Sequence, residues 1–191
     1  ELLRIGIQEK DLNKAISAEQ FENPTILEFL NLNEFQTAWQ SEAYRPLVNW
    51  DHVHCSHEAK ASLNNNKEAD SKVISSIFPR LKQWALRDAQ QTRVVITDQQ
   101  GTEYTVQPLT EYNPVKGQAI QINQNYPELD PIELYAWFLG MNINWRGRGI
   151  FLDYYMTFPV AYPIEVKDKI LASFRRGLMR SLPESLIADE Q

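Results

Sequence analysis

The chain has 191 residues, of which 43% are hydrophobic and 23% are charged, with a formal net charge of −6. This is the composition of a globular protein with room for one domain or two small lobes. It argues against a nucleic-acid or membrane partner, because the charge is negative and no apolar run approaches the roughly 20 residues of a membrane span.

Residue patterns in the first half predict short helices and strands in alternation. Helices are expected at 8–20, 34–40, 56–63 and 73–85, and extended runs at 25–30 and 45–54. Pro79 lies inside the last helical pattern, so a break or kink is expected there.

The second half contains clearer signals. Two strands, 93–97 and 103–107, are joined by a four-residue turn ending in Gly101 and predict a β-hairpin. A helix is predicted from Asp130, a good N-cap that is followed by proline and, three residues on, by glutamate. Gly140 is its expected stop.

The stretch 149–178 is the most distinctive part of the chain. Its aromatic-rich first part, 149–158, predicts a long strand, and a turn ending at Pro163 leads into an amphipathic helix. Apolar residues at i, i+4 spacing from Val166 to Leu178 form the expected buried row of that helix. Residues 175–177 suit its end.

The histidines and the single cysteine form a cluster that could bind a metal. They are His52, His54, Cys55 and His57. Their side chains favour zinc or copper, but their spacing in a strand divides them between two faces and no second cluster completes a four-ligand site. A strand end with exposed histidines is the favoured interpretation. One cysteine forms no internal disulfide, and a reducing, cytoplasmic compartment is expected.

Two further features have a structural and a functional interpretation. The aromatic residues between Tyr135 and Phe158 form either a packed core, which is favoured, or a binding surface. Asp153 lies in the predicted apolar strand and needs a partner if it is buried, and a structural hydrogen bond is its favoured role.

Several segments have residue patterns found in one known family, in the same order. They are 23–29, 57–60, 73–81, the hairpin ending at Pro108, 131–140, and Thr157-Phe158-Pro159-Val160-Ala161-Tyr162 with its following helix. This order resembles the first lobe of the nucleotide-binding domain of DnaK-type (seventy-kilodalton heat-shock) chaperones, in the actin-like ATPase superfamily.

The resemblance implies an α/β (mixed α+β) fold, a fragment of an actin-like lobe with flanking helices around a mixed sheet. Residues 20–129 would form an outer-subdomain-like region that bears the hairpin 93–107, and residues 130–182 a helix–strand–helix element of the inner subdomain. Because the chain begins at Glu1 without methionine, residues 1–191 are expected to be a single fragment of a longer protein.

The resemblance also suggests roles for individual residues. Pro159 matches the family's coupling proline, and Lys167 matches its basic partner, although as lysine in place of arginine. Arg80 and Lys82 are the candidates for the catalytic lysine, and Glu184 is the nearest match for the catalytic glutamate. None of the seven glycines forms the family's phosphate-binding hairpins, so ATP and magnesium are expected for the parent protein and no cofactor for this chain.

These observations favour a structural and coupling part of a chaperone-like ATPase that is inactive alone and binds the remainder of its own domain. A further protein partner is compatible with this role. The alternatives are a free-standing protein-interaction module without ATPase activity, and a metal-binding protein that uses the histidine and cysteine cluster.

Overall fold

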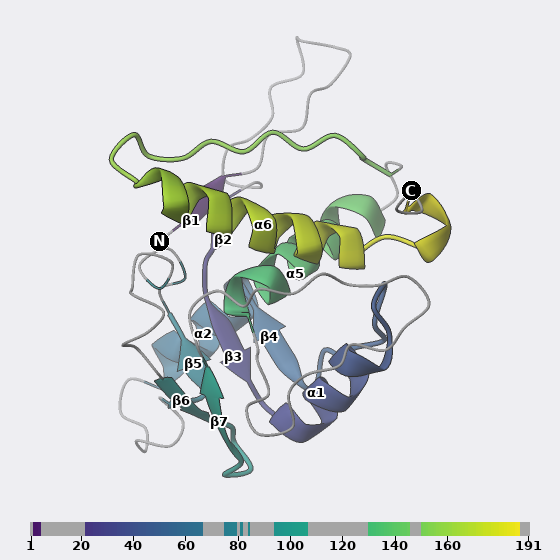
Figure 1. Cartoon of the computed structure of the whole chain (residues 1–191). Helices are drawn as coiled ribbons and strands as arrows, with labels where there is room; N and C mark the ends of the chain where they lie inside the picture. The colour runs from purple at the N-terminus through teal and green to yellow at the C-terminus, as the bar shows by residue number, and fades with distance from the viewer. Residues whose placement is uncertain are drawn as a thin grey trace, which may run out of the picture.

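A computed structural model gives the fold of most of the chain. It describes residues 2–4, 22–66, 75–79, 81, 84, 94–106, 130–145 and 150–187. The predicted mixed α/β class is confirmed, because small antiparallel sheets pack against α-helices (Figure 1). The helix predicted at 8–20 lies outside the described residues.

The strands of the described residues form three small sheets. Their bounds are β1 Leu2–Arg4, β2 Glu22–Pro24, β3 Leu27–Phe29, β4 Val53–Cys55, β5 Ile77–Phe78, β6 Val94–Thr97 and β7 Glu103–Val106. β1 pairs with β2, β3 lies between β4 and β5, and β6 pairs with β7 in the predicted hairpin. All of these pairings are antiparallel.

Helix α1, Leu32–Ser41, is longer than the predicted helix at 34–40. Side chains accept hydrogen bonds from two backbone N–H groups of its first turn. The Asn31 side chain accepts a hydrogen bond from the Glu34 N–H at 3.1 Å. Asp98, in the β6–β7 turn, accepts one from the Leu32 N–H at 2.8 Å through its second oxygen, Oδ2. Its other oxygen, Oδ1, accepts a hydrogen bond from the Thr102 N–H and so stabilises the turn. One buried carboxylate therefore joins the hairpin to the helix and satisfies donors of both.

Helix α2, His57–Asn65, confirms the prediction for 56–63, but the helix predicted over 73–85 is wrong at Ile77 and Phe78. These two residues form β5 because β3 offers them an edge, with Leu27 opposite Phe78, and both become buried there. Pro79 separates this strand from helical Leu81, so regular structure breaks where the proline predicts.

Helix α5, Pro131–Trp145, begins as predicted. The Asp130 carboxylate accepts hydrogen bonds from the Ile132 and Glu133 N–H groups at 2.9 and 3.3 Å. The predicted stop at Gly140 is wrong, because the helix continues for five more residues. Gly140 instead allows a close approach to Ser181, whose side chain would overlap any Cβ at that position.

Helix α6, Ile164–Arg180, lies across α5, and a short 3-10 helix, η2 Glu184–Leu186, follows it (Figure 1). Ile170 is buried, while Val166 and Phe174 are half-buried against the same core, as the predicted apolar row requires. The helix does not end at 175–177, since its last turn continues to Arg180.

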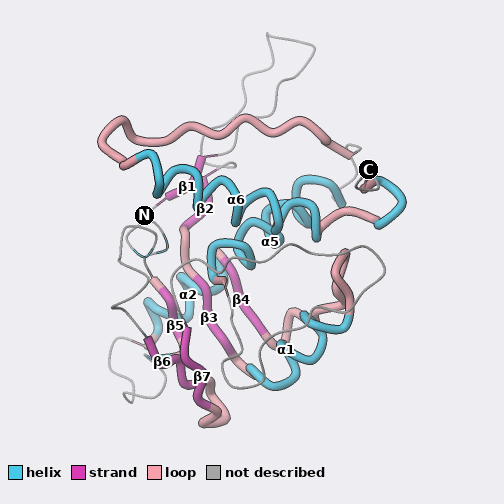
Figure 2. Tube along the Cα trace, in the orientation of Figure 1, coloured by secondary structure: helices cyan, strands magenta, loops and turns pink. Residues whose placement is uncertain are grey.

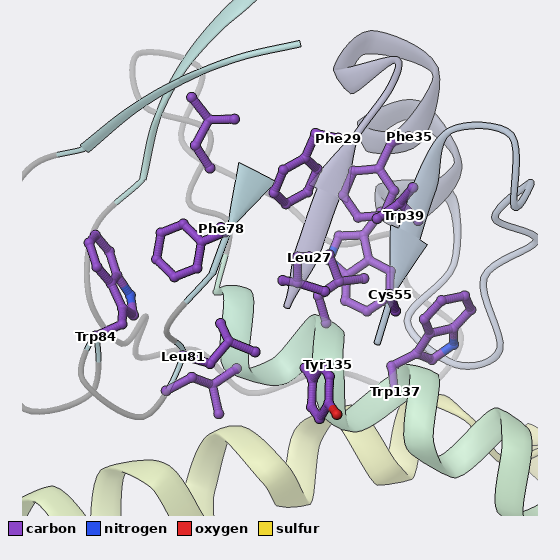
Figure 3. Packing of buried hydrophobic residues seen from close by; sticks show 14 of the residues in the cluster. Leu27, Phe29, Phe35, Trp39, Cys55, Phe78, Leu81, Trp84, Tyr135 and Trp137 are labelled. Carbon is purple, nitrogen blue, oxygen red and sulfur yellow. The ribbon is translucent and has the colours of Figure 1, made fainter. Parts of the chain in front are cut away.

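The main core lies between the β3–β4 sheet, α1 and α5. Figure 3 shows Tyr135 and Trp137 of α5 in the same cluster as the sheet side chains Leu27 and Cys55. Aromatic rings continue the contact into α1, where Trp39 lies 5.4 Å from Trp137, centroid to centroid. The core therefore holds α5 on the sheet, while α6 rests on the outer side of α5.

Candidate interaction site: an extended segment that leads into helix α6

The long strand predicted over 149–158 is wrong, because residues 150–159 belong to none of the sheets in the described part of the chain. They form an extended loop that runs in the opposite direction to α6 and turns into it (Figure 2). We call residues 150–162 the extended segment. Its sequence has the aromatic-rich, apolar composition of a strand, but no neighbouring described strand pairs with it.

Part of the extended segment is anchored on the helices. The Asn144 side chain of α5 accepts a hydrogen bond from the Phe151 N–H at 2.8 Å and donates one to the Tyr154 hydroxyl at 2.7 Å. Met156 and Phe158 are half-buried against the main core. Met156 and Phe158 thus face inward, as alternate residues of an extended chain do, and Tyr154, although 36% exposed, is tied to α5 through its hydroxyl.

Other positions along the extended segment, of both parities, are open to solvent. Tyr155 is 96% exposed, Val160 is 95% exposed and Leu152 is 62% exposed. Within the described residues, the backbone groups of 152–158 make no hydrogen bond. Exposed apolar groups beside free backbone donors and acceptors are typical of a surface that binds another polypeptide.

The proposed coupling residues lie where this segment enters α6. Pro159 is exposed, and its carbonyl accepts the Tyr162 N–H at 3.1 Å to close a turn. Lys167 is half-buried in the first turn of α6, where its N–H donates to the Pro163 carbonyl at 3.1 Å. The structure therefore places both residues on consecutive elements at the end of the extended segment.

A buried ionic network holds α6 on α5. The Arg176 guanidinium donates to Asp130 at 3.0 Å and to Glu133 at 3.1 Å, and it also contacts the Ser173 hydroxyl at 3.3 Å. Both carboxylates are buried. Burial of these charges is tolerated because each has an opposite charge and several hydrogen bonds.

Arg180, one turn later, extends the network to α1. Its side chain is fully buried and donates to Glu133 at 3.1 Å. It also donates to the backbone carbonyls of Trp39, Glu42 and Ala43, at and just after the end of α1. The guanidinium lies 3.6 Å from the Trp39 ring centroid. This one arginine therefore satisfies orphan carbonyls of α1 while it fixes α6.

The network predicts a pH effect through Asp130. Burial and the neighbouring Glu133 raise the pKa of Asp130 to about 6, against the lowering effects of Ser173, Arg176 and the Ile132 N–H. The folded state then binds more protons than the unfolded state between about pH 4 and 6. The resulting stabilisation of the folded state is at most about 3 kcal/mol. It is complete below pH 4 and is lost as the pH rises through 6.

Asp130→Asn should remove that dependence, because the amide oxygen still caps α5 but does not titrate. We expect the unfolding free energy of wild type minus that of the variant, measured by urea titration, to fall between about pH 4 and 7. A constant difference would show that Asp130 is ionised throughout. Asp153→Asn, at an exposed position, is the control.

Of the three catalytic candidates, Glu184 alone lies in the described residues. Arg80 and Lys82 lie outside the described residues. Glu184 is exposed at the start of η2.

The histidine and cysteine residues take separate partners. His54 Nδ1 lies 3.0 Å from buried Glu28, directly across the β3–β4 pair, and His57 Nε2 lies 2.9 Å from the Glu22 carbonyl. Cys55 is buried, and this burial raises the pKa of its thiol well above the usual value. No group of three or more potential ligands in the described ranges could hold a metal ion. Only His57 is exposed as predicted, since His52 and His54 are half-buried.

The aromatic residues divide between the two predicted roles. Tyr135 and Trp137 are core residues, whereas Tyr155 is almost fully exposed. Phe151 and Phe158 are half-buried at the boundary. Asp153 is exposed, so it does not need a buried partner, and the structural hydrogen bond favoured for it is not found in the described residues.

The residues that hold the site in place were missed from the sequence. Arg176 suggested only a helix end, and Arg180 and Asn144 had no assigned role. One signal was available: Glu133 lies in an otherwise apolar helix and needs a cation when buried. The i, i+4 spacing of the two arginines on α6 could have supplied that cation.

Comparison of the chain with protein-family models, with curated proteins and with solved structures finds no match. None of the helices in the described part of the chain has the length and apolar character needed to cross a lipid bilayer.

Proposed function

We propose that this chain is a structural and coupling part of a DnaK-type, chaperone-like ATPase and has no ATPase activity by itself. The observation that carries this proposal is the extended segment. It has an aromatic-rich, strand-like composition, open backbone groups and exposed apolar residues, and it leads directly into α6. A segment of this kind is suited to contact the remainder of its own domain, with Pro159 and Lys167 at the junction.

A parent protein of this kind would bind ATP with magnesium through residues outside this chain. The test is calorimetric titration with MgATP of the full-length gene product and of residues 1–191. We expect binding to the full-length protein and no measurable binding to residues 1–191. Tight one-to-one binding to residues 1–191 would overturn the inactive role, and a full-length protein that does not bind MgATP would overturn the ATPase assignment.

A second candidate is a free-standing protein-interaction module. It is favoured by one observation, namely that α6 packs on helix α5 and not directly on a sheet. In this case the extended segment would be the contact surface, and the full-length protein would show no response to nucleotide in the same titration.

A further inference from the structure

The extended segment has the chemistry needed to pair with a copy of itself. Its backbone groups from 152 to 158 make no hydrogen bond in the described structure, and Tyr155 at the centre of this run is 96% exposed. A row of regularly spaced donors and acceptors is complemented only by another extended backbone. Asp153 is the only charged residue in the run, so charge repulsion along it is small.

The side chains define one favourable register. In an antiparallel pair centred on Tyr155, each Asp153 lies opposite Thr157 of the other copy, so that a carboxylate meets a hydroxyl donor. Tyr154 then lies opposite Met156, a favourable contact of an aromatic ring with a thioether. Tyr155 lies opposite itself, and no like charges meet.

This register also agrees with the anchoring of the segment. Tyr154, Met156 and Phe158 face the helices of their own chain, and the register pairs residues of even number with residues of even number. The inward rows of both copies therefore lie on one face of the two-stranded ribbon. Asp153, Tyr155 and Thr157 lie on the other face, and the interface has the two-fold symmetry of most dimers.

We infer that two copies of residues 1–191 associate through antiparallel pairing of residues 153–157, centred on Tyr155. Such a short ribbon supports a weak dimer. The inference concerns residues 1–191 alone, because in the parent protein the proposed domain contact would occupy the same segment, and the MgATP titration tests that role separately.

Sedimentation equilibrium of residues 1–191 between about 5 and 500 µM tests the association, a range chosen for weak binding. The average mass should rise from 22.2 kDa toward twice that value. Tyr155→Lys should weaken the dimer about tenfold, because two lysines then face each other. Thr157→Lys should leave it unchanged or strengthen it, because each lysine faces Asp153. Both positions are exposed, so neither change disturbs the fold.

Cysteine cross-linking tests the register. Tyr155→Cys places two thiols on facing residues, whose Cα atoms lie about 4.5–5.5 Å apart in an antiparallel pair. Thr157→Cys places them roughly 13 Å apart along the strands, too far for a disulfide. The native Cys55 is buried, so the wild-type chain is the background control. A monomer at every concentration overturns the inference, and so does a dimer in which Thr157→Cys cross-links as fast as Tyr155→Cys.

Discussion

Replacement of Arg180 by methionine should lower the unfolding free energy by about 3–5 kcal/mol. The change leaves Glu133 buried with one cation fewer and removes the donor to three backbone carbonyls near the end of α1. Methionine fills a similar volume, so the loss reports charge and hydrogen bonding more than packing.

Urea titration monitored by circular dichroism at pH 7 gives the measurement. Arg175→Met is the matched control, since Arg175 is an exposed neighbour on the same helix, and its unfolding free energy should change by no more than about 0.5 kcal/mol. Equal losses for the two variants would show that the buried network contributes nothing beyond helix propensity. Arg180→Lys should restore little, because an ammonium group does not reproduce the fork of guanidinium donors.

Gly177→Ala should destabilise the protein by about 3 kcal/mol or more, although alanine is the better helix former. At this position α6 touches α5 so closely that an added Cβ would overlap the Glu133 carbonyl. It would also lie 2.7 Å from the Ala136 Cβ and 2.8 Å from the Trp137 nitrogen. These are mostly rigid helix atoms, so the two helices must separate and weaken the ionic network beside them.

The control is Ala172→Gly on the exposed side of α6, which should cost about 1 kcal/mol through helix propensity alone. Both variants are measured by urea titration as before. A Gly177→Ala variant as stable as wild type would mean that the α5–α6 contact is looser than the structure shows. A loss larger than that of the control, with helix content retained, would support the close crossing.

These two positions also bear on the extended segment. The segment is anchored on α5 through Asn144 and continues into α6, so its geometry depends on how the two helices sit together. We therefore expect the crossing residues to affect any partner contact indirectly, through the position of the segment and not through direct contact.

Local sequence signals predicted most of the elements. The hairpin, α1, α2 and the start of α5 follow from turn residues, caps and apolar spacing, which act within a few residues. The same rules failed where a distant segment decided the outcome. Ile77 and Phe78 have helical spacing but pair with β3. Gly140 was predicted to end helix α5, but it lies inside the helix and permits close contact with Ser181.

In the candidate site too, local features were predictable from the sequence and features that depend on distant residues were not. The aromatic-rich character of 149–158 was evident, and its entry into a helix at Pro163 is confirmed. Whether such a segment pairs depends on a neighbouring strand, and the described sheets supply none. The roles of Arg176 and Arg180 were also hidden, because their carboxylate partners lie more than 40 residues away in the chain.

The sequence by itself determined the mixed α/β class, the amphipathic α6 and the strand-like segment before it, because period and capping are local properties of the chain. Only the tertiary structure decided that this segment is exposed and unpaired, and that two arginines in α6 bind buried carboxylates of α5. Burial and pairing depend on which distant residues share a surface, and no local pattern carries that information.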